Sequence, residues 1–340
     1  MGYVVSIATV VLLAAHLLAM SVPSAAPLVC IWLHRRGGRG DAAAHAVGRK
    51  LARLSLASLL VGAALGVLLG AAMWAAEDRA YWDAVARFPM QAYGFALGEL
   101  GFTAICLAVY TATWDRSRNR PRLHAVLAVL ATTNLVYHFP PLMIALGDLA
   151  ARPELIQTEV VTRPVFRELL LQPELQAKVL HFVLASVMVA GVMLMLVARH
   201  QPALVEHDDG TQRLVSRGAW IALIASFCQL VVGAWVLVQL PAGAQAALLG
   251  VDWLATLLFV LSLLAVFYLL HSLASAALGS TSPASIRRTA ALMLSVVLLM
   301  SAVLTRVRYI ETSIHQFAML RDTTASQPAS FVRSSARKQP

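Results

Sequence analysis

Charged residues and cysteines are scarce in this 340-residue chain, and each scarcity excludes a class of protein. Charged residues make up 13% of the sequence and hydrophobic residues 59%, with a mean hydropathy of +0.72. A soluble globular domain averages about 25% charged residues, so the composition predicts an integral membrane protein. The cysteines, Cys30, Cys106 and Cys228, lie within apolar runs and form no CxxC pair. Disulfides, zinc sites and c-type haem attachment therefore lack support.

The sequence also lacks a concentrated basic face and a cleavable signal. Its net charge is +10, but the basic residues lie in short segments between apolar runs. That pattern is typical of membrane topology and not of phosphate binding, so we expect no nucleic-acid partner. No positively charged segment precedes the first apolar stretch, and we expect no cleaved leader.

Long apolar runs are abundant instead. About 20 apolar residues span a bilayer, and the candidate spans are Val4–Leu33, Leu54–Ala75, Met90–Thr113, Leu123–Leu149, Val179–Ala198, Ala219–Leu240, Val251–Leu278 and Thr289–Val307. We therefore expect an all-α fold, a polytopic membrane bundle of about eight transmembrane helices over residues 1–320. The polar tail at 321–340 is expected to be disordered.

Lys and Arg residues set the expected orientation. Of the 27 in the chain, 15 lie in the loops after the first, third, fifth and seventh spans, which should face the inside. Both termini are then outside. Residues 150–178 mix prolines with acidic and apolar positions, and we expect short helices at the outer interface there.

Few ionisable residues lie within the spans, and each costs at least a few kcal/mol in a bilayer. His16, Glu99 and His138 lie nine to twelve residues from the outer ends of their spans, roughly 14 to 18 Å deep, and His181 lies near the outer edge. Imidazole is the usual ligand of b-type haem iron, so this outer layer on separate helices favours a cofactor site. Any one histidine could instead only hydrogen-bond a neighbouring helix.

Other patterns have structural interpretations. Glycines spaced by four residues, at Gly62, Gly66 and Gly70 and at Gly94 and Gly98, predict close helix approach. A second set of histidines lies in or next to the inner loops and is expected to be solvated: His34, His45, His124, His200 and His207.

Several motifs resemble subunit I of the cytochrome bd quinol oxidases. "FRELLLQPELQAKVLH" is similar to the segment ahead of that family's low-spin haem histidine, here His181. "ATTNLVYHFPPL", with Asn134, resembles the family's Ser-Asn-Leu stretch, "TATWDR" its Trp-Asp-Arg, and "GELG" places Glu99 at the family's acidic position. His16 matches its N-terminal high-spin haem histidine. The resemblance covers roughly residues 5–240.

The departures from the family are equally specific. The large quinol loop is reduced to "PAGAQAALLGVD", and "VDWLATLLFVLSLLAVFYLL" contains no methionine for the second axial position of the low-spin haem. The family's Gly-Arg-Gln-Pro-Trp signature and ninth helix are missing. His138, which the family does not generally have, is a hypothetical further haem ligand.

The resemblance implies a haem-dependent electron-transfer function. His16 and His181 would hold haem iron, with His138 as a third, tentative ligand, and Glu99 would be a catalytic proton carrier or ligand. It implies haem b, with a high-spin haem b or d as a further candidate, and oxygen as a candidate acceptor. Implied partners are a second membrane subunit and a quinol or c-type cytochrome as electron donor. The location would be the bacterial cytoplasmic membrane.

Two other interpretations stay open. The chain could be a haem-bearing electron conduit or anchor of a respiratory complex without oxygen chemistry. It could also be a haem-free transporter or scaffold built on the same helix framework, although no inverted repeat is evident.

Overall fold

The computed structural model describes residues 2–76, 78–119, 121–200 and 208–325. Within these residues, eight helices are long and apolar enough to cross a membrane. They are α1 (Gly2–Gly37), α2 (Ala42–Ala75), α4 (Met90–Ala112), α5 (Pro121–Ala151), α7 (Pro173–Arg199), α8 (Asp208–Gln239), α10 (Trp253–Ala277) and α11 (Pro283–Ala325). The shorter elements are α3 (Arg79–Ala86), η1 (Arg116–Asn119), η2 (Pro153–Leu155), α6 (Arg163–Leu170), α9 (Ala242–Ala246) and η4 (Ala247–Val251). The predicted all-α bundle of eight spans is confirmed.

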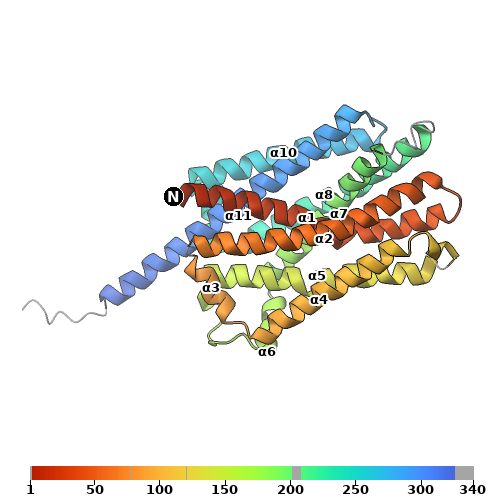
Figure 1. The fold of residues 1–340 in the computed structure, drawn as a ribbon. Coiled ribbons are helices and arrows are strands. Elements are labelled where there is room, and N and C mark those ends of the chain that lie inside the picture. Colours follow the sequence, from red (N-terminus) through yellow and green to blue (C-terminus); the bar gives the residue numbers. More distant parts are fainter. Residues whose placement is uncertain (1, 77, 120, 201–207, 326–340) are drawn as a thin grey trace, which may run out of the picture.

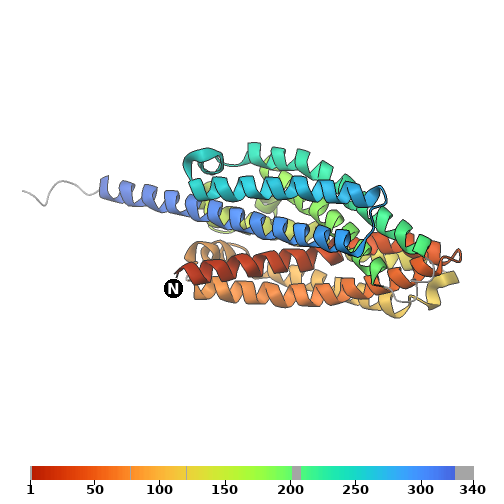
Figure 2. The same ribbon diagram turned by 90° about the horizontal axis from the view of Figure 1, so that it is seen from above.

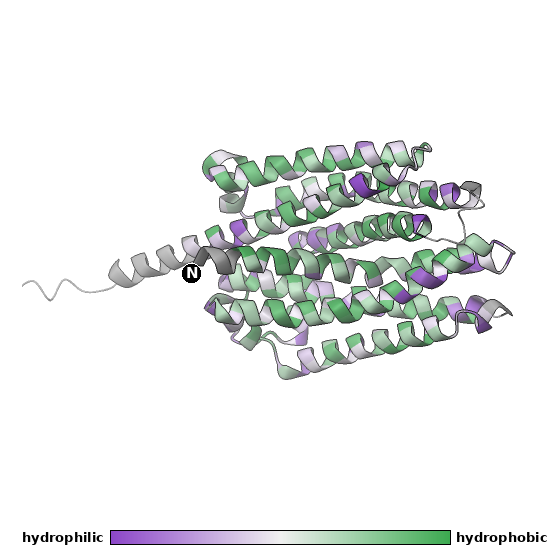
Figure 3. Ribbon diagram, turned by 45° about the horizontal axis from the view of Figure 1, so that its top comes forward, coloured by the Kyte–Doolittle hydropathy of each residue, from purple (hydrophilic) through white to green (hydrophobic). Residues whose placement is uncertain are grey.

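The long helices run side by side along one axis (Figures 1 and 2). The start of α1 and the end of α11 lie together at one end, with the segments 78–89 and 152–172; we call this the terminal end. The opposite end, with the turns at 38–41, 113–119 and 278–282, is the loop end. Hydrophobic positions cover most of each long helix (Figure 3), as a lipid surrounding requires.

Local sequence signals explain where several helices begin and end. Asp41 and Asp252 cap α2 and α10, because their carboxylates accept hydrogen bonds from the backbone N–H of Ala44 at 2.9 Å and Ala255 at 2.8 Å. Gly279 has a φ of 113° after α10, a left-handed conformation that glycine adopts without strain.

The buried core is divided unequally between the two ends. One large cluster fills the loop-end half and draws on all eight long helices and on the 113–119 turn; it includes Leu33, Leu51, Trp114, Met195 and Leu273. The terminal end has two separate clusters. One joins α3, α4, α5, α6 and α7, and the other joins α9, η4, α10 and α11.

Glycines allow close helix contact at some of the predicted positions. A Cβ on Gly62 would lie 2.5 Å from Met20 Sδ of α1, and one on Gly66 would lie 2.9 Å from the His16 ring. The prediction is wrong for Gly70, Gly94 and Gly98, where a Cβ would have no neighbour within 4 Å. A close contact between the backbones of α7 and α8 was not foreseen. A Cβ on Gly191 of α7 would lie 2.6 Å from the carbonyl oxygen of Gly218 of α8.

Short helices cover the terminal end, as expected for residues 150–178. Arg87, after α3, holds this segment by donating hydrogen bonds of 2.7 Å to the carbonyl oxygens of Pro153, Ile156 and Thr158. Helix α11 continues to Ala325, into the stretch expected to be a disordered tail; residues 326–340 lie outside the described residues.

Candidate functional site

His16 of α1 lies against the glycine side of α2. Its Nδ1 donates a hydrogen bond of 2.8 Å to the carbonyl oxygen of Gly62, and Gly66 provides the space for the ring. With the proton on Nδ1, the lone pair of Nε2 is left free. Metal-binding histidines commonly have this arrangement, in which a backbone carbonyl fixes the tautomer and the ring direction.

His181 of α7 has a comparable position against α8. The amide of Gln229 donates to its Nε2 at 3.1 Å. A Cβ on Gly233 of α8 would lie 3.4 Å from Cε1 of the ring, an ordinary van der Waals contact. Its Nδ1 is buried and has no hydrogen-bond partner in the described part of the chain. Gln229 was not identified from the sequence. Its only signal was an amide within an apolar span.

Glu99 lies on α4 at the contact with α5. The amide of Asn134 donates to the Glu99 carbonyl oxygen at 2.7 Å and to the Thr103 hydroxyl at 2.9 Å. Asn134 thus fixes the backbone of α4 at Glu99 and leaves the carboxyl group unused. Its Oε2 is buried without a partner among the described residues.

His138 lies one turn further along α5 and packs between two phenylalanines. Its ring centroid is 5.2 Å from that of Phe95 on α4 and 5.8 Å from that of Phe166 on α6, both edge-on. Its Nε2 is also buried without a partner in the described residues. Phe95 precedes Glu99 by one turn and Asn134 precedes His138 by one turn, so the α4–α5 contact brings Glu99 and His138 to the same region.

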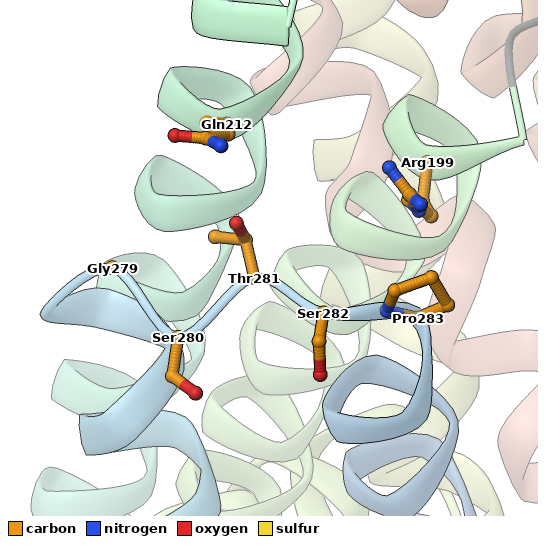
Figure 4. A pocket seen from close by; sticks show the side chains of 7 residues that line it. All are labelled: Arg199, Gln212, Gly279, Ser280, Thr281, Ser282 and Pro283. Atoms are coloured by element: carbon orange, nitrogen blue, oxygen red, sulfur yellow. The ribbon is translucent and has the colours of Figure 1, made fainter. Parts of the chain in front are cut away.

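The predicted residues do not form one compact cluster. Within the described ranges, no group of three or more His, Cys, Asp or Glu side chains is close enough to hold a metal ion together. His16 and His181 belong to separate helix pairs. A pocket of about 420 Å³ lies at the loop end instead, between α7, α8 and the turn before α11 (Figure 4). None of the predicted site residues lines it.

A network of charges lies at the terminal end, beginning one turn before His181. Lys178 contacts Asp148 at 2.5 Å and Glu174 at 2.7 Å, and Arg152 contacts Glu174 at 2.7 Å. Burial alone would lower the pKa of Arg152, but hydrogen bonding and the charges of Glu174, Asp148 and Glu311 raise it overall. Only the Glu174–Lys178 spacing was visible in the sequence.

The histidines near the inner loops are not all solvated, which corrects the expectation. His34 and His124 are 3% and 2% exposed, and their rings lie 4.4 Å apart. His124 stacks on Tyr110 at 4.0 Å, and Trp114 meets His34 edge-on at 4.8 Å. His200 is exposed as expected, and His207 lies outside the described residues. Rings fill this cluster, which is therefore part of the core.

Comparisons with known proteins show a likeness in structure but none in sequence. No protein-family model matches the chain, and a search of curated proteins found no match by sequence. Among solved structures, a chain of the bd oxidase from Geobacillus thermodenitrificans matches with a TM-score of 0.67 and 15% sequence identity. The match covers 92% of this chain and 87% of the other. The chain shares its fold with a bd oxidase.

The structural likeness extends beyond the sequence resemblance. The motifs covered residues 5–240, whereas 92% coverage must include much of α10 and α11. At 15% identity the likeness establishes a membrane oxidase-like fold.

The donor groups in the terminal half have the chemistry that haem requires. Imidazole ligates iron through an unprotonated ring nitrogen. His16 leaves its Nε2 lone pair free and His138 has a ring nitrogen without a partner, whereas His181, whose Nε2 accepts from Gln229, would exchange that hydrogen bond for the iron. Gly94 and Gly98 lie on the exposed face of α4 beside Glu99, where no atom comes within 4 Å of a Cβ and the helix backbone is left open. The residues present therefore fit the group.

Proposed function

We propose that this chain is a membrane protein that binds b-type haem and passes electrons through it, with the fold of a bd oxidase. One observation carries the proposal. Imidazoles from α1, α5 and α7 each keep a ring nitrogen without a hydrogen bond inside an apolar bundle. The unpartnered nitrogens of His138 and His181 are buried, and a buried polar group without a partner costs about 1–3 kcal/mol, so repeating it on two helices favours a ligand that pairs them.

Each residue has a separate role in this proposal. His181 holds a low-spin haem, His16 holds a high-spin haem b or d, and His138 is a third ligand on a different wall. When bound, haem supplies a centre that gains and loses one electron. The Gly62 carbonyl fixes the tautomer of His16 and Gln229 orients His181.

Glu99 is the proposed catalytic residue and holds or delivers a proton beside the site. Asn134 acts through it, because its amide fixes the α4 backbone at Glu99 without occupying the carboxyl group. An unpaired carboxyl in an apolar site can exchange a proton where no water reaches freely. This role suits an oxidase, in which protons must reach a reduced acceptor.

The proposed setting is a respiratory chain in the bacterial cytoplasmic membrane, with the terminal end outside. Oxygen is the proposed acceptor, a quinol or a c-type cytochrome the donor, and a second membrane subunit the partner. A conduit without oxygen chemistry is the second candidate. It is favoured by the short connection between α8 and α10, which contains α9 and η4 where the family resemblance implies a long quinol loop.

Haem content of purified variants tests the proposal. We expect His181→Ala and His16→Ala each to lose haem relative to the wild type, measured as pyridine haemochrome per chain. His271→Ala is the matched control, because His271 is exposed near the loop end of α10. Equal haem content in all four proteins would contradict the assignment of ligands. A haem-free wild type from a haem-sufficient host would leave the transporter or scaffold interpretation.

A further inference from the structure

The pocket at the loop end has no part in the proposed haem chemistry. It has a volume of about 420 Å³ and lies where α7 ends, α8 begins and the turn at 278–282 joins α10 to α11 (Figure 4). Apart from Gly279 and Pro283 its lining is polar, and consists of Arg199, Gln212, Ser280, Thr281 and Ser282. Small-molecule sites have volumes of about 300–1,000 Å³, so the pocket is large enough for a ligand group.

Arg199, the last residue of α7, is the cation of this pocket. Its side chain is exposed and forms no ion pair in the described part of the chain. Other arginines at the loop end are paired, Arg36 with Asp41 at 2.9 Å and Arg49 with Asp115 at 3.1 Å. A guanidinium group offers two parallel donors that match the spacing of phosphate oxygens. Arg199 is therefore available to an anion.

The turn between α10 and α11 adds a hydroxyl group. In Figure 4 the side chain of Thr281 points from the turn toward the part of the pocket between Gln212 and Arg199. The hydroxyl of Ser282 is already used, because it accepts a hydrogen bond of 3.2 Å from the backbone N–H of Ser285 at the start of α11. Ser282 thus fixes the turn, and Thr281 supplies a donor beside Arg199.

The charges around the pocket favour an anion. The two segments that form it, 199–217 and 279–288, contain five arginines and three carboxylates. The arginines are Arg199, Arg213, Arg217, Arg287 and Arg288, and the carboxylates are Glu206, Asp208 and Asp209. All five arginines are exposed. The excess of positive charge attracts anions to this part of the surface.

The pocket lies at the level where helices leave the apolar part of the bundle. Arg199 is the last residue of one candidate membrane span, and Pro283 is the first residue of another. Leu278, next to the pocket residue Gly279, is 81% exposed, so an apolar side chain adjoins the polar lining. Basic pockets between transmembrane helices bind the headgroups of anionic lipids in this way.

We infer that the loop-end pocket binds the phosphate group of an anionic membrane lipid. Arg199 binds two phosphate oxygens through its guanidinium group, and Thr281 donates a hydrogen bond to the phosphate. The acyl chains follow the apolar surface of α10 from Leu278. The bound lipid joins the end of α7, the start of α8 and the turn before α11. This inference does not depend on the proposed haem chemistry.

The test is the affinity of the purified chain, in an uncharged detergent, for dioctanoyl phosphatidylglycerol, measured by titration. In the wild type we expect saturable binding and a melting temperature that rises with lipid concentration. Arg199→Gln should raise the Kd about tenfold or more, because a charge-assisted contact is lost. Arg35→Gln is the matched control. Arg35 is an exposed arginine at the loop end of α1 that does not line the pocket, so the same change in net charge should leave the Kd unaltered.

A second variant tests the site without changing its charge. Thr281→Val removes the hydroxyl group at nearly constant volume, and it should raise the Kd by a factor of a few, as expected for one neutral hydrogen bond. The melting temperature of each variant without lipid shows whether the fold is intact. A Kd that is the same in Thr281→Val, Arg199→Gln and the wild type would overturn the inference.

Two further ligands separate the possible sources of the phosphate group. Inorganic phosphate lacks acyl chains and dioctanoyl phosphatidylcholine carries a compensating positive charge, so we expect both to bind more weakly than the anionic lipid. Arg199-dependent binding of inorganic phosphate that is as tight as lipid binding would overturn the lipid assignment. Equal losses in Arg199→Gln and Arg35→Gln, or no saturable binding by the wild type, would also overturn it. The haem assignment is unaffected by any of these results.

Discussion

The two halves of the bundle contain buried histidines in opposite surroundings. At the loop end, His34 and His124 lie in contact with each other and with Tyr110 and Trp114, and a single large core continues around them. In the terminal half the core is split, and His16 and His181 lie on different helices, each against a glycine of its neighbour. Burial of an imidazole is thus not in itself a functional signal.

The largest effect on stability should come from removing the loop-end ring cluster. Trp114 is fully buried, and a Cβ on Gly48 would lie 2.7 Å from its ring. Trp114→Ala should cost about 3–5 kcal/mol in the free energy of unfolding, measured by thermal or denaturant melting in detergent. The haem spectrum of the protein that remains folded should not change. A selective loss of haem would mean that the loop end also belongs to the site.

A smaller effect is expected where a glycine makes room for His16. In Gly66→Ala the new methyl group would lie 2.9 Å from His16 Cε1, so the ring must shift, at a cost of about 1–3 kcal/mol. The high-spin haem signal should shift with it. Gly70→Ala on the same helix is the control, because its methyl group would meet nothing within 4 Å. Equal spectra for both variants would contradict the placement of His16 at iron.

The Asp252–Arg306 pair should contribute less, and only above acidic pH. Hydrogen bonding from Arg306 holds the pKa of Asp252 below its usual value, so the ionised form stabilises the folded chain. This contribution is complete above the unfolded pKa of about 4 and is lost as pH falls through the lower folded pKa. Asp252→Asn keeps the helix cap and should lose about 1 kcal/mol at pH 7 and nothing once the pH lies below the folded pKa of Asp252. A deficit that persists at low pH would point to a packing defect.

The smallest effect on stability is expected at His138, together with a clear spectral change. Its side chain makes no hydrogen bond in the described residues, so His138→Ala removes a buried polar atom that has no partner. The melting temperature should stay within error of the wild type, whereas haem stoichiometry or the haem spectrum should change. An unchanged spectrum would remove His138 from the ligand set.

The spans were predictable because hydropathy adds up locally, and eight runs of about 20 apolar residues leave few alternative folds. Depth along each helix was predictable from the constant rise per residue. The burial of His34 and His124 was not predictable, because α1 continues to Gly37 and α5 begins at Pro121, both beyond the apolar runs. The helices therefore carry these rings into the core.

Contacts between helices could not be predicted from the sequence either. The pairing of His181 with Gln229, and of Glu99 with Asn134, depends on how each helix is rotated about its axis. Rotation is set by packing of side chains from several elements at once, and the weak amphipathicity of membrane helices gives little indication of it. Glu311 lies 133 positions beyond Lys178, and only the tertiary fold brings α11 to the charge network.

The most direct test of the account is a dithionite-reduced minus oxidised absorbance spectrum of the wild-type chain in membranes of a haem-sufficient host, with and without carbon monoxide. We predict reduced b-type bands and a further change on adding carbon monoxide, because the high-spin haem proposed at His16 would bind carbon monoxide. Bands that are insensitive to carbon monoxide would favour the conduit. The absence of any haem band would contradict the central claim that the terminal half of this bundle is a haem site.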